Sequence, residues 1–213
     1  AIANNVAEYR ICDDASNDGL EDFDLSTQDN QVLGTQNAAN FSIEYFTSQA
    51  DADLGSVGGA TPLPTSYNSG STTVFVRIQT NANTSCYDTA VFDLFVDPLP
   101  LAGTPADIIV CDDPSNDGTE DVNLSQFDNA ILNGQTNPSF NVTYHASQAD
   151  ADANANPLSS PYAVSSTTPS LFARIDNADN DSCYTTSTFR FVISPTPTAN
   201  PVVDMITCDD PGN

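Results

Sequence analysis

Two short acidic loops hold the residues best suited to chemistry in this sequence. Each loop directly follows a Cys-Asp pair and carries candidate ligands at every second position, with a glycine at the turn. Alternate side chains of such a loop point inward and a backbone carbonyl adds a further oxygen, so the spacing predicts a calcium site in each loop. The predicted metal-binding residues are Asp14, Ser16, Asp18, Leu20 and Asp22 in the first loop and Asp113, Ser115, Asp117, Thr119 and Asp121 in the second.

The spacing resembles the first part of the EF-hand calcium loop, including its glycine. That loop ends in a bidentate acid, where this chain has Leu25 or Leu124. Asp13, Asp24, a water or a residue from elsewhere would have to complete the site. The alternative is an ordinary tight turn, because Asn-Asp-Gly forms such turns without a metal. In favour of calcium, the carboxylates of each loop repel one another and the chain has no lysine to offset them.

The cysteines recur in the same pattern as the acidic loops. Each of two successive units has one cysteine just before its acidic loop and a second near the start of its last long strand. This pattern predicts one disulfide in each unit, Cys12–Cys86 and Cys111–Cys183, and leaves Cys208 without a partner in either complete unit. Metal thiolates are the alternative, but no Cys-x-x-Cys motif occurs. Disulfides predict a location outside the cytoplasm.

No catalytic constellation recurs between the two units. The chain's single histidine, His145, has Phe46 at the equivalent position and is expected to be a solvated surface residue. Arg77 and Arg174 do recur in the middle of a strand, where a structural ion pair with a strand neighbour is expected. We therefore expect no enzymatic activity.

Charge restricts the partners of this chain. Its 213 residues include 29 acids and only 4 basic residues, which gives a formal net charge of −25. The negative electrostatic potential around such a chain repels phosphate backbones and anionic lipid surfaces, so no nucleic-acid partner is expected. No stretch approaches the roughly 18 apolar residues of a membrane span, so no membrane insertion is expected in this fragment. An apolar content of 39% with 7 Tyr and 11 Phe is enough to form a core.

An internal repeat organises the chain. Residues 12–53 align with residues 111–152 without a gap, and the similarity continues through Ser-Cys-Tyr to a closing Pro-x-Pro. A unit of about a hundred residues is long enough to own a complete core. The predicted domains are repeat 1 over residues 1–97, repeat 2 over 98–196, and a linker with the first strand of a truncated repeat 3 over 197–213.

Each repeat shows the pattern of short strands. Residues 41–45 and 140–144 alternate apolar and polar side chains, and residues 73–78 and 90–96 are rich in β-branched and aromatic residues. Short helical turns are predicted after Ser26 and Ser48 and at the equivalent positions in repeat 2. The predicted fold is all-β, with tandem immunoglobulin-like β-sandwich modules, short helical turns and one disulfide per module.

The combined motifs indicate a family. The Cys-Asp-Asp…Asn-Asp-Gly loop, the Ser-Gln-Ala-Asp-Ala-Asp segment, Ser-Cys-Tyr and the closing Pro-x-Pro all occur twice. Together they resemble the tandem modules of very large cell-surface proteins of gliding Bacteroidota, which are exported by type IX secretion and described as gliding-motility-associated or adhesin-like. This resemblance implies an extracellular or cell-surface filament.

The function expected from these observations is a structural stalk of an extracellular adhesin or surface filament, stiffened by disulfides and by calcium. Its expected partners are the neighbouring repeats of the same chain and a surface polymer or cell-surface ligand. One alternative is a polysaccharide- or protein-binding module that acts by multivalency. The other is a fibre or sheath that forms by self-association. Proline-rich linkers over residues 98–105 and 195–201 favour extended joints.

Overall fold

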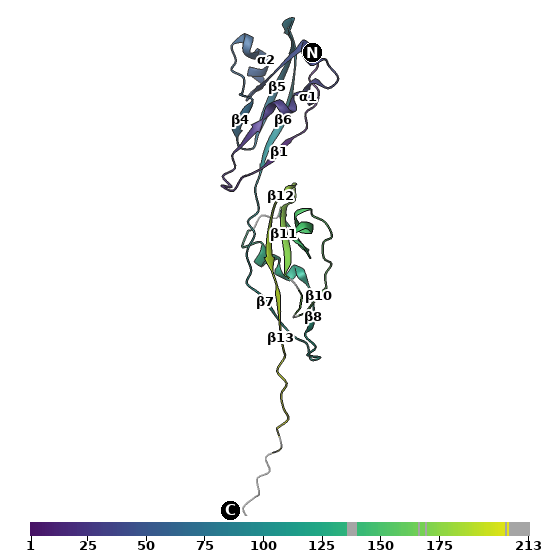
Figure 1. Cartoon of the computed structure of the whole chain (residues 1–213). Helices are drawn as coiled ribbons and strands as arrows, with labels where there is room; N and C mark the ends of the chain where they lie inside the picture. The colour runs from purple at the N-terminus through teal and green to yellow at the C-terminus, as the bar shows by residue number, and fades with distance from the viewer. Residues whose placement is uncertain (136–139, 166, 169, 203, 205–213) are drawn as a thin grey trace, which may run out of the picture.

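Two β-sandwich modules lie end to end in the computed structural model, with the N-terminal module at the top of Figure 1. The structure describes residues 1–135, 140–165, 167–168, 170–202 and 204. The expected first strand of a third repeat, with Cys208, lies outside the described residues. No helix in the described part of the chain is long and apolar enough to cross a membrane.

The first module is built on a four-stranded sheet with the order β1-β6-β5-β3. Its first strand pairs parallel with β6, whereas the other neighbours are antiparallel. A two-stranded sheet of β2 and β4 covers it. The strands are β1 (Tyr9–Cys12), β2 (Glu21–Asp24), β3 (Phe41–Phe46), β4 (Ser66–Ser69), β5 (Thr72–Thr80) and β6 (Asn83–Asp97). The predicted alternating segments therefore form strands, and the predicted hairpin is β5–β6.

The second module repeats this arrangement with one break. The counterpart of β6 is interrupted at Arg190, so β12 pairs with β11 while β13 pairs parallel with β7. A further pair is formed by β8 and β10. The strands are β7 (Ile108–Cys111), β8 (Thr119–Val122), β9 (Phe140–His145), β10 (Tyr162–Ser165), β11 (Leu171–Asn177), β12 (Asn180–Phe189) and β13 (Phe191–Ser194). The prediction of tandem β-sandwich modules is confirmed.

Short helical segments join the strands, as predicted, although the first helical cap of each module differs from the prediction. They are η1 (Leu25–Gln28), α1 (Asp29–Leu33), η2 (Ala38–Asn40), α2 (Gln49–Gly58), η3 (Leu124–Phe127), α3 (Asp128–Ile131) and α4 (Gln148–Asp152). Ser48 caps α2 by accepting a hydrogen bond from the backbone of Asp51, as expected. The predicted cap at Ser26 is wrong, because Asp24 accepts the hydrogen bond from Ser26 N and starts η1.

Each module has its own apolar core, formed where the inner faces of its strands meet the short helices. In the first module the largest buried side chains are Phe23, Phe46, Leu25, Ile78, Leu94, Val32 and Val74. In the second module they include Leu124, Ile131, Leu171 and Ile175. Because neither core depends on apolar side chains of the other module, the contact between modules must be made by other groups.

A buried arginine joins the helix to the sheet in the first module. Arg77 is 4% exposed and donates hydrogen bonds to the carbonyls of Ala52 and Asp53 in α2, at 2.9 and 2.8 Å. It also donates to the carbonyl of Thr84 at 2.8 Å, and its guanidinium lies 3.5 Å from the centre of the Tyr87 ring. Five donors in a rigid fork suit this set of acceptors, which a lysine could not satisfy.

Arg174 repeats this arrangement in the second module and adds an ion pair. It donates to the carbonyls of Ala151 and Asp181, stacks on the Tyr184 ring at 3.7 Å, and pairs with Asp176 at 3.2 Å. The predicted structural ion pair with a strand neighbour is therefore confirmed for Arg174. In both modules the arginine binds a carbonyl and an aromatic ring on either side of the second cysteine, and so fixes the strand that carries it.

His145 contradicts the sequence-based expectation. It was expected at the surface, but it is fully buried. Its Nδ1 lies 2.8 Å from the carbonyl of Ala155 and its Nε2 lies 3.0 Å from the hydroxyl of Thr143. A carbonyl only accepts, so Nδ1 donates to Ala155, and the hydroxyl of Thr143, which can donate or accept, pairs with Nε2. Both ring nitrogens have hydrogen-bond partners, which allows an imidazole to be buried in place of the apolar Phe46 of the first module.

The proline-rich segment between the modules is held against the second module. Thr185 Oγ1 donates to the carbonyl of Pro100 at 2.6 Å, and Ser187 Oγ donates to that of Gly103 at 2.5 Å. Gly103 N donates in turn to Ile131 O at 2.7 Å. A Cβ at Gly103 would lie 2.3 Å from a backbone oxygen, so only glycine fits. The segment is thus part of the second module and leaves a joint of only a few residues.

Replacement of Arg77 tests its role in the fold. Arg77→Met should lower the free energy of unfolding of the first module by roughly 3 kcal/mol or more, because several buried acceptors lose their donor. Equilibrium urea denaturation of the full chain measures this loss. The matched control is Arg190→Met, whose side chain is 60% exposed in its pair with Asp107 and should change stability little. Equal effects of the two substitutions would contradict the role of Arg77.

Candidate functional site at the module junction

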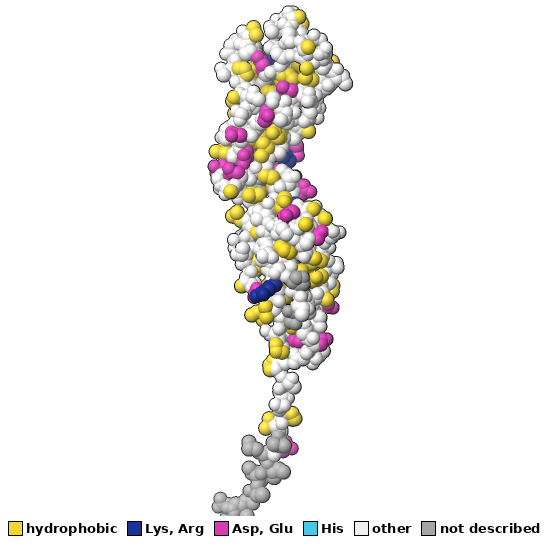
Figure 2. Space-filling model, in the orientation of Figure 1, with side chains coloured by type: hydrophobic (Ala, Val, Ile, Leu, Met, Phe, Trp, Pro, Cys, Tyr) yellow, Lys and Arg dark blue, Asp and Glu magenta, His cyan; other side chains and the backbone are white. Residues whose placement is uncertain are grey.

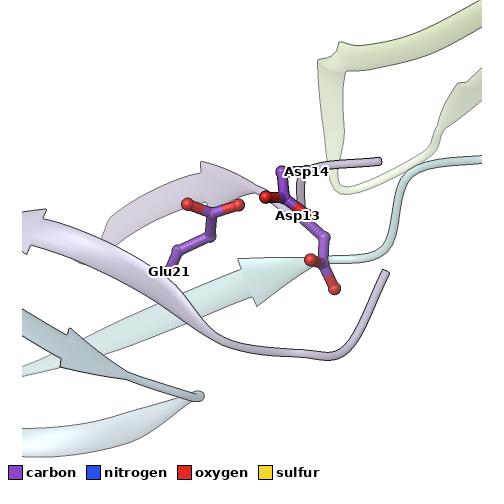
Figure 3. Close-up of side chains that lie close together, drawn as sticks. All are labelled: Asp13, Asp14 and Glu21. Carbon is purple, nitrogen blue, oxygen red and sulfur yellow. The ribbon is translucent and has the colours of Figure 1, made fainter. Parts of the chain in front are cut away.

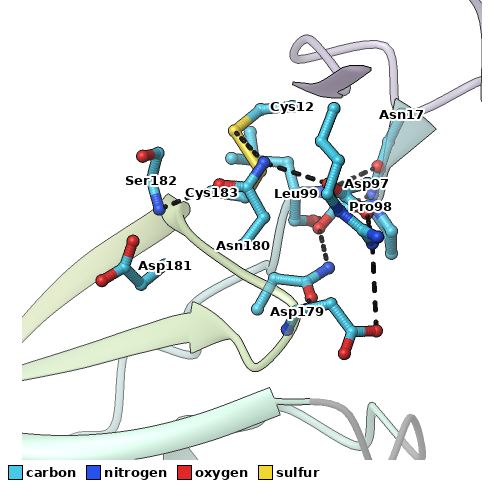
Figure 4. The surroundings of a disulfide bond; sticks show 12 residues. Cys12, Asn17, Asp97, Pro98, Leu99, Asp179, Asn180, Asp181, Ser182 and Cys183 are labelled. Atoms are coloured by element: carbon cyan, nitrogen blue, oxygen red, sulfur yellow. Dashed lines mark hydrogen bonds and ion pairs between the residues drawn. A yellow bond between two sulfur atoms is a disulfide. The ribbon is translucent and has the colours of Figure 1, made fainter. Parts of the chain in front are cut away.

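One disulfide joins the two modules to each other. Cys12 at the end of β1 is bonded to Cys183 on β12, with their Cα atoms 5.2 Å apart (Figure 4). The predicted pairs, Cys12–Cys86 and Cys111–Cys183, are wrong. Among the described residues, Cys86 and Cys111 are free and exposed.

Strand length explains why the predicted pairing fails. Cys12 lies opposite Asp97 at the far end of β6, eleven residues from Cys86 on the same strand. At ~3.3 Å per residue this separates the two cysteines by about 36 Å. A disulfide needs Cα atoms within about 7 Å, so the two cysteines of one module cannot meet. The cysteine at the end of one module instead meets the cysteine at the near end of the next.

A buried carboxylate binds both modules beside the disulfide. Asp97, at the end of β6, is 4% exposed and accepts hydrogen bonds from Arg10 Nε at 3.0 Å and Nη2 at 2.5 Å. It also accepts from Asn180 Nδ2 of the second module at 3.0 Å. Arg10 in turn lies 4.0 Å from the carboxylate of Asp179 across the junction. Charge-assisted hydrogen bonds of this kind fix geometry, and here they orient the β11–β12 turn on the first module.

Asparagines hold the departing chain in both modules. The side chain of Asn17 donates to the carbonyl of Leu99 and accepts from its amide, both at 3.1 Å. Asn116 makes the same pair of hydrogen bonds with Thr196, both at 3.0 Å. Across the junction, Asn177 Nδ2 donates to the carbonyl of Pro98 at 3.3 Å. The joint is therefore bound on both sides, and the acidic loop that contains Asn17 is part of it.

A cluster of three carboxylates lies at the base of each acidic loop. In the first module, Asp13, Asp14 and Glu21 each place one carboxylate oxygen within 4.8 Å of the others (Figure 3). In the second module the cluster consists of Asp112, Asp113 and Glu120. Of the predicted calcium ligands, the structure brings only Asp14 and Asp113 into these clusters.

Three of the four other predicted ligand carboxylates accept hydrogen bonds outside the clusters. Asp18 accepts from the backbone of Leu20 at 3.0 Å, and Asp22 accepts from Asn68 on β4 at 2.9 Å. In the second loop Asp117 accepts from the backbone and hydroxyl of Thr119, which hold the pKa of Asp117 below its ordinary value. Ser16 N likewise donates to Asp14 at 2.7 Å, and hydrogen bonds from Ser16 lower the pKa of Asp14. The contacts with backbone amides two residues further on are those of ordinary Asx turns, whereas the contact between Asp22 and Asn68 joins paired strands.

Sequence reasoning missed Glu21 and Glu120 as members of the clusters. Each is the second residue after the turn glycine, and in the structure Glu21 is the first residue of β2 and Glu120 the second of β8. A signal was present, since an acid recurs at this position in both repeats of a chain with very few glutamates. The EF-hand spacing predicts ligands at every second residue of the loop and none at this position on the strand beyond it.

The cysteine pairing can be mapped chemically. In native protein under non-reducing conditions, a maleimide should modify Cys86 and Cys111, whereas Cys12 and Cys183 should react only after reduction and unfolding. Peptide mass spectrometry of the non-reduced digest should recover a Cys12–Cys183 cross-link. Recovery of a Cys12–Cys86 cross-link would contradict the structure.

Comparison with known families agrees with this geometry. No curated protein matches the chain. The family model described as the Flavobacterium inter-domain disulphide bond domain matches residues 8–100 and again residues 107–197. The two matches fall on the two modules, and the family's description names the type of bond that Cys12 and Cys183 form. The disulfide also places the protein in an oxidising compartment outside the cytoplasm. The chain therefore belongs to the Flavobacterium inter-domain disulphide bond domain family, of which it contains two tandem copies.

Proposed function

We propose that this chain is a stiff, non-catalytic stalk segment of a cell-surface adhesin or surface filament. The observation that carries the proposal is the Cys12–Cys183 disulfide, which crosses the junction beside the connecting peptide. Two covalent connections between successive modules oppose both bending and twisting at the joint. The hydrogen bonds of Asp97 and Asn177 across the same junction add a fixed orientation.

The repeat equivalence of the cysteines extends this connection beyond one pair of modules. Cys111 occupies the position of Cys12, and Cys86 occupies that of Cys183. Both are exposed and, within the described residues, free, and they belong to the module ends that face away from the junction. We infer that Cys86 bonds a preceding module and Cys111 a following one. A continuous series of such bonds would make a long array behave as one stiff rod.

The surface charge supports an extended and well-separated filament. Acidic side chains are scattered along the visible face of both modules, and basic ones are few (Figure 2). With a net charge of −25, neighbouring copies of this chain repel each other at low ionic strength. This favours a stalk over the alternative of a laterally packed sheath.

The free cysteines allow a direct measurement of stiffness. In a Cys208→Ser background, donor and acceptor dyes attached to Cys86 and Cys111 should lie about 70 Å apart, two strand lengths. Single-molecule energy transfer should give one narrow distribution. Replacing Cys12 and Cys183 by serine should broaden it and add shorter distances, because the joint is then held by one peptide and a few hydrogen bonds.

Arg190→Ser, far from the junction, is the matched control and should leave the distribution narrow. Reduction of the labelled parent should reproduce the broadening of the double serine variant. A broad distribution in the oxidised parent, or an equally narrow one without the disulfide, would overturn the proposed stiff stalk.

A further inference from the structure

We propose that Asp13, Asp14 and Glu21 form a calcium site in the first module, and that Asp112, Asp113 and Glu120 form an equivalent site in the second. This inference does not depend on the proposed stalk function. It replaces the ligand set suggested by the EF-hand spacing with the carboxylates that the fold brings together.

Buried oxygens without partners point to a missing ligand. Asp13 is 5% exposed and Asp112 is 6% exposed, yet Oδ1 of each finds no hydrogen-bond donor among the described residues. The same holds for Oε1 of Glu21 and of Glu120. A buried carboxylate oxygen with no partner is costly, and native proteins rarely leave one. Here the same two atoms are left unpaired in both modules.

The second oxygen of the buried aspartate shows that its position is fixed. Asp13 Oδ2 accepts from Gly19 N at 2.7 Å, and Asp112 Oδ2 accepts from Gly118 N at 2.8 Å. Backbone Asp13 N also donates to the carbonyl of Asp97 at 2.8 Å. The aspartate is therefore held at its backbone nitrogen and at one carboxylate oxygen, which fixes its carboxylate beside the other two of the cluster.

No basic side chain neutralises the clusters. The chain has 4 basic residues in total. Arg10 pairs with Asp97, Arg174 with Asp176 and Arg190 with Asp107, while Arg77 is buried against α2. Three carboxylates within 4.8 Å of one another repel unless a cation lies between them.

Calcium fits this donor set better than other metals. It binds carboxylate oxygens at about 2.3–2.6 Å, so the oxygens around one ion lie at most about 5 Å apart, and the three carboxylate oxygens of each cluster lie within 4.8 Å of one another. Zinc prefers nitrogen and sulfur ligands, and magnesium requires a tighter octahedron. Asp14 is exposed, and in the second module a surface hollow lined by Asp113, Thr119, Glu120 and Asp121 opens at the cluster. Waters can complete the coordination from this side.

The proposed site lies at the joint. Asp13 directly follows Cys12 of the disulfide, and the loop between Asp13 and Glu21 contains Asn17, which holds the departing chain. An ion here would bind the end of β1, the loop and the start of β2 to one another. Calcium would then tighten the segment that anchors the bond to the next module.

Calorimetric titration of the metal-free full chain with calcium chloride tests the proposal. Two sites per chain are expected, with dissociation constants of about 0.1–1 mM as in other extracellular modules. Glu21→Gln should leave one site, and Glu21→Gln/Glu120→Gln should leave none. The matched control, Asp18→Asn/Asp117→Asn, changes loop carboxylates outside the clusters and should keep both sites. Magnesium chloride should give much weaker binding.

Thermal unfolding provides the second readout. Calcium should raise the midpoint of the parent chain and of the control, but not that of Glu21→Gln/Glu120→Gln. Without calcium the double variant should melt at or above the parent temperature, because neutralising one carboxylate relieves repulsion. Absence of calcium binding to the parent, unchanged binding in the double variant, or loss of binding in the control would each overturn the proposed sites. None of these outcomes bears on the energy-transfer test of stiffness.

Discussion

The parallel pairing of the first strand with the last long strand is the constraint on which the rest of this structure depends. It places Cys12 opposite Asp97, at the end of the module where the chain leaves. The second cysteine of the module sits near the start of the same long strand, at the opposite end. One strand length therefore separates the two sulfur atoms of a module. From this separation follow the bond between modules and the position of the acidic loop at the joint.

Precise placement of the second cysteine depends on a buried guanidinium. Arg77 and Arg174 bind the end of a short helix on one side and the strand that carries Cys86 or Cys183 on the other. An exposed hairpin end would otherwise be among the more mobile parts of a sheet, since few apolar contacts hold it. The arginine and its stacked tyrosine connect this end to the helix and so position the sulfur for its partner in the neighbouring module.

Much of the fold could be predicted from the sequence because its signals are local. Alternation over residues 41–45, the cap at Ser48 and the repeat itself each depend on neighbouring residues, and all are found in the structure. The cysteine pairing could not be derived in this way. It depends on which strand lies beside β1 and in which direction it runs, and hydrophobic periodicity carries no information about either.

The same limit applies to the candidate site and to His145. Glu21 lies beside Asp13 and Asp14 only because the loop folds back at Gly19. The ligand spacing of the EF-hand loop does not include this position. His145 is buried because Thr143 and the carbonyl of Ala155 satisfy it, a pairing that depends on where the chain turns after α4. Interactions across a turn of unknown shape are the part of a structure that sequence patterns describe least.

The disulfide also changes what a cut in the backbone does to the molecule. Cys12 and Cys183 are separated by 171 positions, so most of both modules and the whole connecting segment lie inside one covalent ring. A protease that cleaves a single peptide bond within that ring opens it but releases no piece. In the proposed stalk, an array of such rings, each overlapping the next, would keep its outer end after a single cut in any one ring.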